Sequence, residues 1–248
     1  MTTLGQKQTR DQQLYWVADN VIASRFPAVE SALRDPDGLL AIGGDLGTAR
    51  LLDAYRRGIF PWYSEGQPIL WWSPDPRCVL EPDQLKISRS LRKTLRKQPY
   101  RVTFNRAYAN VIAACAKPRR GCVETWITEA MASAYIRLFE EGHAVSVECW
   151  SGERLVGGLY GVVIGRIFYG ESMFSTMNDA SKVAMVYLVR ELQKKDFRLI
   201  DCQVHSRHLQ TLGAKPIPRK LFVNILENYC NHETSRDWPV ESVASDDL

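Results

Sequence analysis

The chain has 248 residues, of which 45% are hydrophobic and 24% are charged, and a formal net charge of +4. These proportions are typical of globular proteins and exclude disordered, collagen-like and coiled-coil classes. No apolar run approaches the roughly 20 residues of a bilayer span, and residues 1–20 lack the apolar core of a secretory signal. We therefore expect a cytoplasmic protein without a membrane partner, in which four of the six cysteines are reduced thiols buried in helices or strands.

The first third of the chain predicts a small, irregular domain. Residues 1–20 are rich in Gln and Thr and predict a loose tail, whereas residues 21–83 are rich in Gly, Pro and Trp. One clear helix is expected near 48–57, with Thr48 as its N-cap and Gly58 as its C-terminal stop. The GGDLG segment before it lacks the Lys-Ser/Thr of a P-loop and is interpreted as a turn.

Residues 84–240 show a more regular pattern, which predicts an α+β domain with a mixed, largely antiparallel sheet. Three alternating apolar runs at 144–150, 155–164 and 167–174 are separated by short turns and predict an antiparallel meander. The remaining predicted elements are strands at 100–104 and 198–204 and helices at 105–116, 128–141, 179–195 and 219–229. Residues 241–248 are acidic and predict a disordered tail.

The charge is concentrated between residues 84 and 123, where no Asp or Glu occurs. Ser88 can cap a short helix whose buried face carries Leu91 and Leu95. Like charges four residues apart repel, so an external polyanion would stabilise this helix. The exposed face of this helix either contacts the phosphates of a nucleic acid without regard to base sequence or is a basic face that contacts only solvent. The basic residues in question are Lys86, Arg89, Arg92, Lys93, Arg96 and Lys97.

Two aromatic segments, 60–63 and 71–77, lie in the Pro-rich region ahead of the basic helix. Aromatic rings beside a basic patch suit base stacking, although most of these rings are expected to form the core of the small domain. A further segment at 124–128 precedes a helix that contains Tyr135, and on its own it indicates only a helix start.

A polar pair interrupts an otherwise apolar strand. Alternation along that strand would place Asp201 and Gln203 on one face and Cys202 on the other. A carboxylate and an amide are costly to bury unless they meet partners or substrate, so these two residues are candidates for a site, with Glu171 as a companion. A hydrogen-bonded structural pair is the alternative. His205 and His208 have no visible third ligand, so no metal site is predicted.

Several motifs resemble the leucyl/phenylalanyl-tRNA–protein transferase family. They are DPDGLLAIGGDLGTARLLDAYRRGIFPWY, PILWWSPDPR, ETWIT, GGLYGV, GESMFS and LIDCQV, and the similarity extends over about residues 26–226. The resemblance implies transfer of Leu or Phe, with Met also considered, from charged tRNA to an N-terminal Arg or Lys of a protein, which marks that protein for degradation. It also implies a small N-terminal domain followed by a GNAT-like acyltransferase domain. The segment 172–178 lacks the glycines of a coenzyme A loop, so no cofactor is expected.

The resemblance assigns roles to matching positions. Trp62 and Trp126 would flank the terminal adenosine of the tRNA, with Tyr135 and Glu171 fixing the acceptor end and the substrate amine. As a separate hypothesis about the mechanism, Gln203 would accept a hydrogen bond from the attacking amine, and Asp201 would polarise and position the Gln203 amide. The aminoacyl side chain would lie in a pocket formed by Leu159, Phe168, Met173 and Leu188.

Two other functions remain open at the level of sequence. One is an aminoacyl-tRNA-dependent transferase with a cell-wall precursor as its acceptor, and the other is a tRNA-binding module without catalysis. A transfer assay with charged tRNA and model peptides distinguishes them. The expected enzyme is a monomer.

Overall fold

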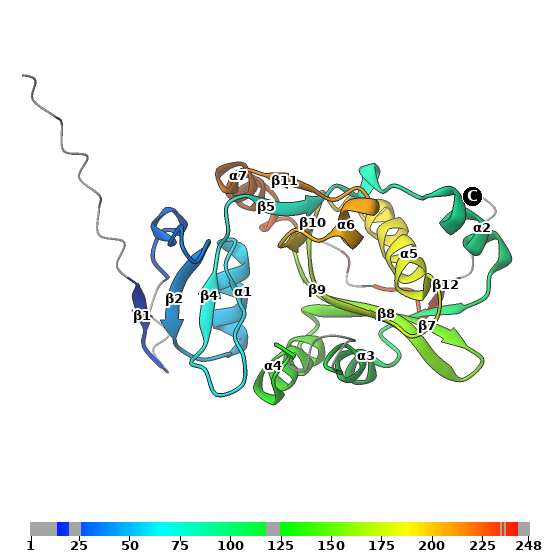
Figure 1. Ribbon diagram of the computed structural model, residues 1–248, viewed down its shortest axis with the longest axis horizontal. Coiled ribbons are helices and arrows are strands. Elements are labelled where there is room, and N and C mark those ends of the chain that lie inside the picture. Colours follow the sequence, from blue (N-terminus) through cyan, green and yellow to red (C-terminus); the bar gives the residue numbers. More distant parts are fainter. Residues whose placement is uncertain (1–13, 20–25, 118–124, 234, 236, 243–248) are drawn as a thin grey trace, which may run out of the picture.

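The structure is a computed structural model that describes residues 14–19, 26–117, 125–233, 235 and 237–242. Its strands form two sheets (Figure 1), a four-stranded sheet ordered β1-β2-β4-β3 and an eight-stranded sheet ordered β11-β5-β10-β9-β8-β7-β6-β12. The strands of the smaller sheet are β1 (Tyr15–Val17), β2 (Leu39–Gly43), β3 (Phe60–Pro61) and β4 (Leu70–Trp72). Those of the larger are β5 (Arg77–Leu80), β6 (Arg101–Phe104), β7 (Ala144–Ser151), β8 (Arg154–Ile164), β9 (Ile167–Ser175), β10 (Leu199–Gln203), β11 (Lys215–Ile217) and β12 (Glu241–Ser242).

Helices cover both faces of the eight-stranded sheet. In Figure 1, α5 lies on one face, whereas α3 and α4 lie on the other. Because both faces are covered, β7, β8 and β9 are almost continuously buried. The helices are α1 (Thr48–Arg56), α2 (Arg89–Lys97), α3 (Tyr108–Cys115), α4 (Glu129–Glu140), α5 (Ala180–Lys194), α6 (Arg207–Thr211) and α7 (Arg219–Tyr229), with short 3-10 turns at Val29–Ser31 and Pro82–Gln84.

The predicted meander is confirmed, since β7, β8 and β9 pair antiparallel in sequence order. The pair β9–β10 is parallel, whereas the other described pairs of this sheet are antiparallel, so the sheet is mixed and largely antiparallel, as predicted. The α+β fold class is therefore confirmed. The five described cysteines are buried and form no disulfide with one another, and Cys122 lies outside the described residues.

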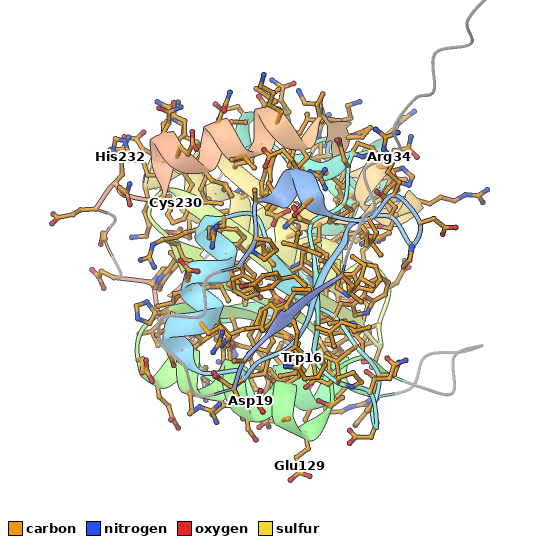
Figure 2. All side chains as sticks on the ribbon, turned by 90° about the vertical axis from the view of Figure 1, so that its left-hand side faces the viewer. Trp16, Asp19, Arg34, Glu129, Cys230 and His232 are labelled. Atoms are coloured by element: carbon orange, nitrogen blue, oxygen red, sulfur yellow. The ribbon has the colours of Figure 1, made fainter. Side chains whose placement is uncertain are left out.

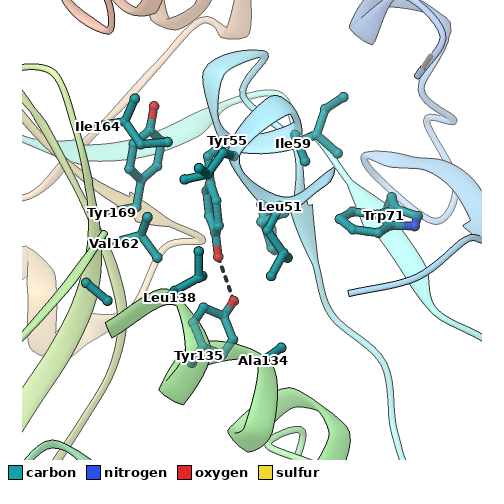
Figure 3. Close-up of a cluster of buried hydrophobic side chains, with 14 of the residues drawn as sticks. Leu51, Tyr55, Ile59, Trp71, Ala134, Tyr135, Leu138, Val162, Ile164 and Tyr169 are labelled. Atoms are coloured by element: carbon teal, nitrogen blue, oxygen red, sulfur yellow. Dashed lines mark hydrogen bonds between the residues drawn. The ribbon is translucent and has the colours of Figure 1, made fainter. Parts of the chain in front are cut away.

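One hydrophobic core joins the two sheets. It contains Leu51, Tyr55 and Ile59 from α1 and the turn after it, and these residues face side chains of α4 and of the larger sheet, among them Leu138 and Val162 (Figure 3). The opposite face of the larger sheet has its own core beneath α2 and α5. The junction between the sheets is thus closely packed, and it provides fixed positions for side chains from both.

Several predicted boundaries are wrong. Tyr15–Val17, expected in a loose tail over 1–20, form β1, which pairs with β2, and Val17 is fully buried. Trp16 remains largely exposed on the face shown in Figure 2. The predicted end of the small domain at residue 83 is also wrong, because β5, which lies before that residue, pairs with β10 and β11 of the larger sheet. Glu241–Ser242, placed in a disordered tail, pair with β6, while residues 1–13 and 243–248 lie outside the described part.

The helix ends show how local chemistry sets the element limits. The Ser88 hydroxyl accepts a hydrogen bond from the backbone of Leu91, as predicted for the basic helix, and Leu91 and Leu95 are buried. The predicted cap of α1 is off by one position, because Gly47 occupies it and Thr48 instead donates to Glu141. None of the helices in the described ranges is long and apolar enough to cross a membrane.

Candidate active site

A cavity of about 370 Å³ opens where the two sheets meet. Its lining residues come from β3, β8, β9, β10, α5 and α6, together with Trp126 ahead of α4. They include the apolar residues Leu159, Phe168, Met173, Met185, Ile200 and Leu209 and the aromatic and polar residues Trp62, Trp126, Tyr160, Glu171 and Gln203. The cavity is large enough for one apolar side chain and the polar groups attached to it.

A β-bulge in β10 turns the side chain of Gln203 toward the cavity. The register with β5 shifts between Asp201 and Gln203, and Gln203 adopts a left-handed backbone with φ of 60°. Bulges commonly change the direction in which a side chain points. Ile200, Cys202 and Gln203 consequently line the cavity and Asp201 does not. The prediction that Asp201 and Gln203 share one face is therefore wrong, because it assumed uninterrupted alternation.

Asp201 is fully buried and forms an ion pair with Arg77. The Arg77 Nε and Nη2 atoms donate to the two Asp201 carboxylate oxygens at 2.8 and 2.7 Å. Asp201 Oδ1 also accepts the backbone N–H of Gln203 at 2.9 Å. Asp201 thus holds the backbone of Gln203, and the expected contact with its side-chain amide is made by another residue.

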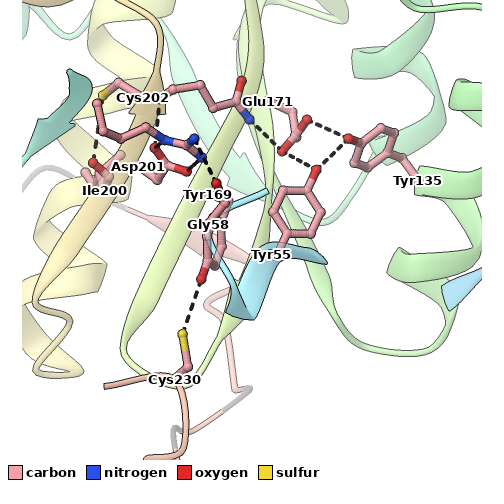
Figure 4. Close-up of polar contacts among 11 residues, drawn as sticks. Tyr55, Gly58, Tyr135, Tyr169, Glu171, Ile200, Asp201, Cys202 and Cys230 are labelled. Atoms are coloured by element: carbon pink, nitrogen blue, oxygen red, sulfur yellow. Dashed lines mark hydrogen bonds and ion pairs between the residues drawn. The ribbon is translucent and has the colours of Figure 1, made fainter. Parts of the chain in front are cut away.

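That residue is Glu171, which accepts three hydrogen bonds (Figure 4). Tyr55 and the Gln203 Nε2 atom donate to Oε1 at 2.7 and 3.1 Å, and Tyr135 donates to Oε2 at 2.7 Å. Burial of the carboxyl raises the pKa of Glu171 to about 7, although the two tyrosine hydrogen bonds act in the opposite direction. Glu171 therefore changes protonation near neutral pH.

The two tyrosines are neutral hydroxyl partners of Glu171 and of each other. Burial, followed by the nearby charge of Glu171, raises the pKa values of Tyr55 and Tyr135 well above their ordinary value. Both phenols consequently keep their protons, and their hydroxyl groups lie 2.6 Å apart. This arrangement fixes the position of the Glu171 carboxylate and leaves the Gln203 carbonyl oxygen free of any contact with Glu171.

Two family models match the chain. The model described as leucyl/phenylalanyl-tRNA protein transferase covers residues 79–227, and the model of the N-terminal domain of that protein covers residues 44–75. The chain belongs to this transferase family. Similar curated relatives include leucyl/phenylalanyl-tRNA–protein transferases from Stutzerimonas stutzeri, with 57% identity over 86% of this chain and 94% of that one, and from Aromatoleum aromaticum, with 60% identity over 88% and 93%.

Two solved structures resemble the fold of this family member weakly. A GCN5-related N-acetyltransferase from Kribbella flavida has a TM-score of 0.36 at 11% identity, with 71% of this chain and 63% of that one covered. The structure of L-PGS from Bacillus licheniformis has a TM-score of 0.37 at 10% identity, with 68% and 54% covered.

Most residues that the family resemblance assigned to binding line the cavity. Trp62 is 43% exposed and Trp126 is partly buried, and both line the cavity. Three of the four predicted pocket residues, Leu159, Phe168 and Met173, also line it. The fourth, Leu188, does not line the cavity, because it is fully buried in the core beneath α5. Met185, three residues earlier on α5, lines the cavity.

Tyr135 also differs from its predicted place. It is fully buried and contacts Glu171 and Tyr55, so it supports the site and does not line the cavity. Sequence reasoning missed Tyr55, Arg77 and Met185. The sequence contained a signal for each of them. Tyr55 and Arg77 lie inside the motifs that carry the family resemblance, and Met185 is one helical turn from the predicted pocket residue Leu188.

The predicted basic residues are exposed and gather on and beside α2, away from the cavity. Lys86, Arg89, Arg92, Lys93, Arg96 and Lys97 are all exposed, and none forms an ion pair within the described ranges. Arg92 and Arg96 border a shallow depression together with Arg190 of α5. In Figure 1 α2 lies at the end of the molecule remote from the four-stranded sheet. Nothing in the described part of the chain groups three metal-ligating side chains at a plausible site.

Proposed function

We propose that the protein transfers leucine or phenylalanine from aminoacyl-tRNA to the N-terminal Arg or Lys of a protein, with formation of a peptide bond. The observation that carries the proposal is the cavity, whose lining combines apolar side chains with the hydrogen-bonded pair Glu171 and Gln203, in a member of the transferase family. The protein would act as a monomer in the cytoplasm. The relatives named above give no support to a cell-wall precursor as acceptor.

The donor would bind with its side chain against the apolar residues of the cavity. Leu159, Phe168, Met173 and Met185 offer apolar surfaces, and apolar surfaces discriminate weakly between side chains of similar size. Tolerance for leucine, phenylalanine and methionine follows. The terminal adenosine would stack on Trp62 and Trp126, an interaction worth about 1–3 kcal/mol per base.

Gln203 would orient the attacking amine. Because its Nε2 donates to Glu171, its carbonyl oxygen is the atom available to accept a hydrogen bond from the neutral α-amine. The amine nitrogen attacks the ester carbonyl carbon, the bond from that carbon to the ribose oxygen breaks, and the amine proton ends on the ribose hydroxyl. An amide is a weak base, so orientation, which can supply roughly 7–11 kcal/mol, is the main contribution.

The exposed residues of and beside α2 would contact the tRNA phosphates. Such contacts do not depend on base sequence and weaken with salt. Because these residues do not line the cavity, they would bind the tRNA body, while the cavity takes its aminoacylated end.

The decisive experiment combines the purified chain with radiolabelled Leu-tRNA and two peptides that differ only in their first residue, Arg or Ala. The proposal predicts label in the Arg peptide and not in the Ala peptide. Label in neither peptide overturns it, and label in both overturns the acceptor specificity. A lipid-linked cell-wall precursor, added as a third acceptor, tests the remaining alternative and is expected to stay unlabelled.

A further inference from the structure

Arg77 on β5 is a fully buried cation that the mechanism above does not use. Its guanidinium makes three hydrogen bonds through three different nitrogen atoms. Two go to Asp201, and the third runs from Nη1 to the carbonyl oxygen of Gly58 at 3.0 Å. The planar guanidinium group therefore joins β10 to the turn that follows α1.

Two aromatic rings fix the plane of this guanidinium. The Arg77 Cζ atom lies 4.7 Å from the ring centroids of both Phe60 and Phe222. Phe222 also fills the space beside Gly58, where an added Cβ would lie 3.1 Å from the ring. With rings against it and its edge bonded to Asp201 and Gly58, the guanidinium has one orientation.

The groups that Arg77 holds are those next to the Glu171 network. Asp201 binds the backbone N–H of Gln203 at 2.9 Å, and Gln203 has a φ of 60°, which non-glycine residues seldom adopt unless their surroundings enforce it. Gly58 lies three residues after Tyr55, whose hydroxyl donates to Glu171. Arg77 thus contacts both chain segments that bring donors to Glu171 Oε1.

We propose that Arg77 is a positioning residue for the transfer reaction. Its two hydrogen bonds to Asp201 fix that carboxylate, and through it the backbone of Gln203. Its third hydrogen bond fixes the turn that follows the helix carrying Tyr55. The inference rests on the proposed function. Lysine cannot replace this residue, because an ammonium group has neither the planar fork nor the stacking faces of a guanidinium.

The test is Arg77→Lys in the full chain. Lysine keeps a positive charge opposite Asp201, so a role limited to neutralising that carboxylate predicts an unchanged rate. Positioning predicts at least a tenfold lower single-turnover transfer rate, with KM for Leu-tRNA changed less than about threefold. Arg50→Lys is the matched control, because Arg50 donates Nε and Nη2 to Asp45 at 3.1 and 3.0 Å outside the cavity; it is expected to leave both constants unchanged.

Amide hydrogen exchange provides a readout that does not depend on activity. In Arg77→Lys the Gln203 amide is expected to exchange at least tenfold faster, while the Ile200 amide keeps its rate. If the wild-type chain transfers no amino acid, the proposed function is wrong. The test of Arg77 then depends on the amide exchange rates alone. A wild-type transfer rate or unchanged Gln203 exchange in Arg77→Lys overturns the inference.

A second pair of variants covers the case in which Arg77→Lys does not fold. Phe222→Leu removes one of the rings against the guanidinium, and Phe197→Leu removes a ring of equal size from the core on the other side of the larger sheet. The inference predicts that only Phe222→Leu lowers the transfer rate per folded molecule, by about threefold or more. Equal rates in the two variants overturn it.

Discussion

Gln203 and Glu171 lie on the parallel neighbours β10 and β9, and the side-chain amide of Gln203 donates to the Glu171 carboxyl over 3.1 Å. This hydrogen bond decides which end of the amide faces the cavity. An ionised Glu171 requires the NH₂ group, whereas a protonated one also tolerates the carbonyl oxygen. We therefore expect the protonation state of Glu171 to influence whether Gln203 offers an acceptor or a donor to the substrate amine.

The first prediction concerns pH. The pKa of Glu171 is raised to about 7 by burial, so the productive orientation of Gln203 is expected to be lost as the pH falls below about 7. The substrate amine titrates equally for wild type and for Glu171→Gln. The informative quantity is therefore the single-turnover rate of wild type divided by that of Glu171→Gln. We expect this ratio to fall as the pH decreases from 8 to 6. A ratio that stays flat over this range contradicts the prediction.

Stability depends on the same shift with a definite sign. Between its unfolded pKa near 4.5 and its folded pKa near 7, Glu171 binds more protons in the folded chain than in the unfolded chain. The free energy of unfolding must therefore decrease as the pH rises through this window. Chemical denaturation at pH 5 and pH 8 should show that Glu171→Gln gains stability relative to wild type at the higher pH.

A second prediction isolates the reach of Gln203. Asparagine tolerates a positive φ better than most residues but is one methylene shorter, so Gln203→Asn removes the contact with Glu171 without a large backbone cost. We expect the single-turnover transfer rate to fall about 100-fold, within the range of general acid–base and orienting groups. The exposed Gln210 on α6 provides the control, Gln210→Asn, whose rate should match wild type. Similar rates in both variants would exclude a direct role for Gln203.

A third prediction concerns the two cavity tryptophans. Trp62→Ala and Trp126→Ala are each expected to weaken binding of an adenosine-ended donor analogue by about 1–3 kcal/mol, which is roughly 5- to 150-fold in Kd. Trp16→Ala serves as a control, because Trp16 is 67% exposed and lies outside this cavity. Fluorescence titration gives the three affinities, and equal losses in all three would refute the stacking assignment.

A fourth prediction addresses the basic helix. Replacement of Arg92, Lys93, Arg96 and Lys97 by glutamine should weaken tRNA binding and reduce its salt dependence by about one unit of log–log slope for each phosphate that is no longer neutralised. A control variant neutralises Lys194 and Lys195, which lie at the end of α5. It tests whether the loss of any two basic residues weakens tRNA binding in the same way. Affinities for tRNA measured at several salt concentrations test this prediction. An unchanged slope in the quadruple variant would show that α2 does not contact the tRNA.

A fifth prediction separates pocket from core on α5. Leu188→Ala should destabilise the fold by about 2–5 kcal/mol, as expected for a fully buried leucine, and leave the preference between leucine and phenylalanine unchanged. Met185→Ala enlarges the cavity and should favour the larger phenylalanine. Thermal denaturation and competition between the two charged tRNAs measure both effects. A changed preference between leucine and phenylalanine in Leu188→Ala would show that Leu188 contributes to the aminoacyl pocket.

The fold was largely accessible from the sequence where patterns are long and regular. The meander of β7, β8 and β9 and the helix at 219–229 were predicted closely, since alternation and helical spacing continue over many residues. Short edge strands such as β1 and β12 were missed, because two or three residues carry no periodicity and depend on partners far along the chain. The position of β5 in the larger sheet is likewise set by pairing with β10.

The site was accessible in part. Trp62, Glu171 and Gln203 could be selected from the sequence, but the bulge that separates Asp201 from Gln203 could not, because it arises from the pairing of β10 with β5 and from the Asp201 side chain. Leu188 and Met185 illustrate the same limit. Helical spacing shows which residues face one another, and only the packed sheet shows which of them borders a cavity.

The core that contains Tyr55, Ile59, Leu138 and Val162 has a consequence for how the molecule can be divided. The two family models separate the chain between residues 75 and 79, yet removal of either part would expose apolar side chains of this core on the other. We therefore expect the two parts to unfold as one cooperative unit.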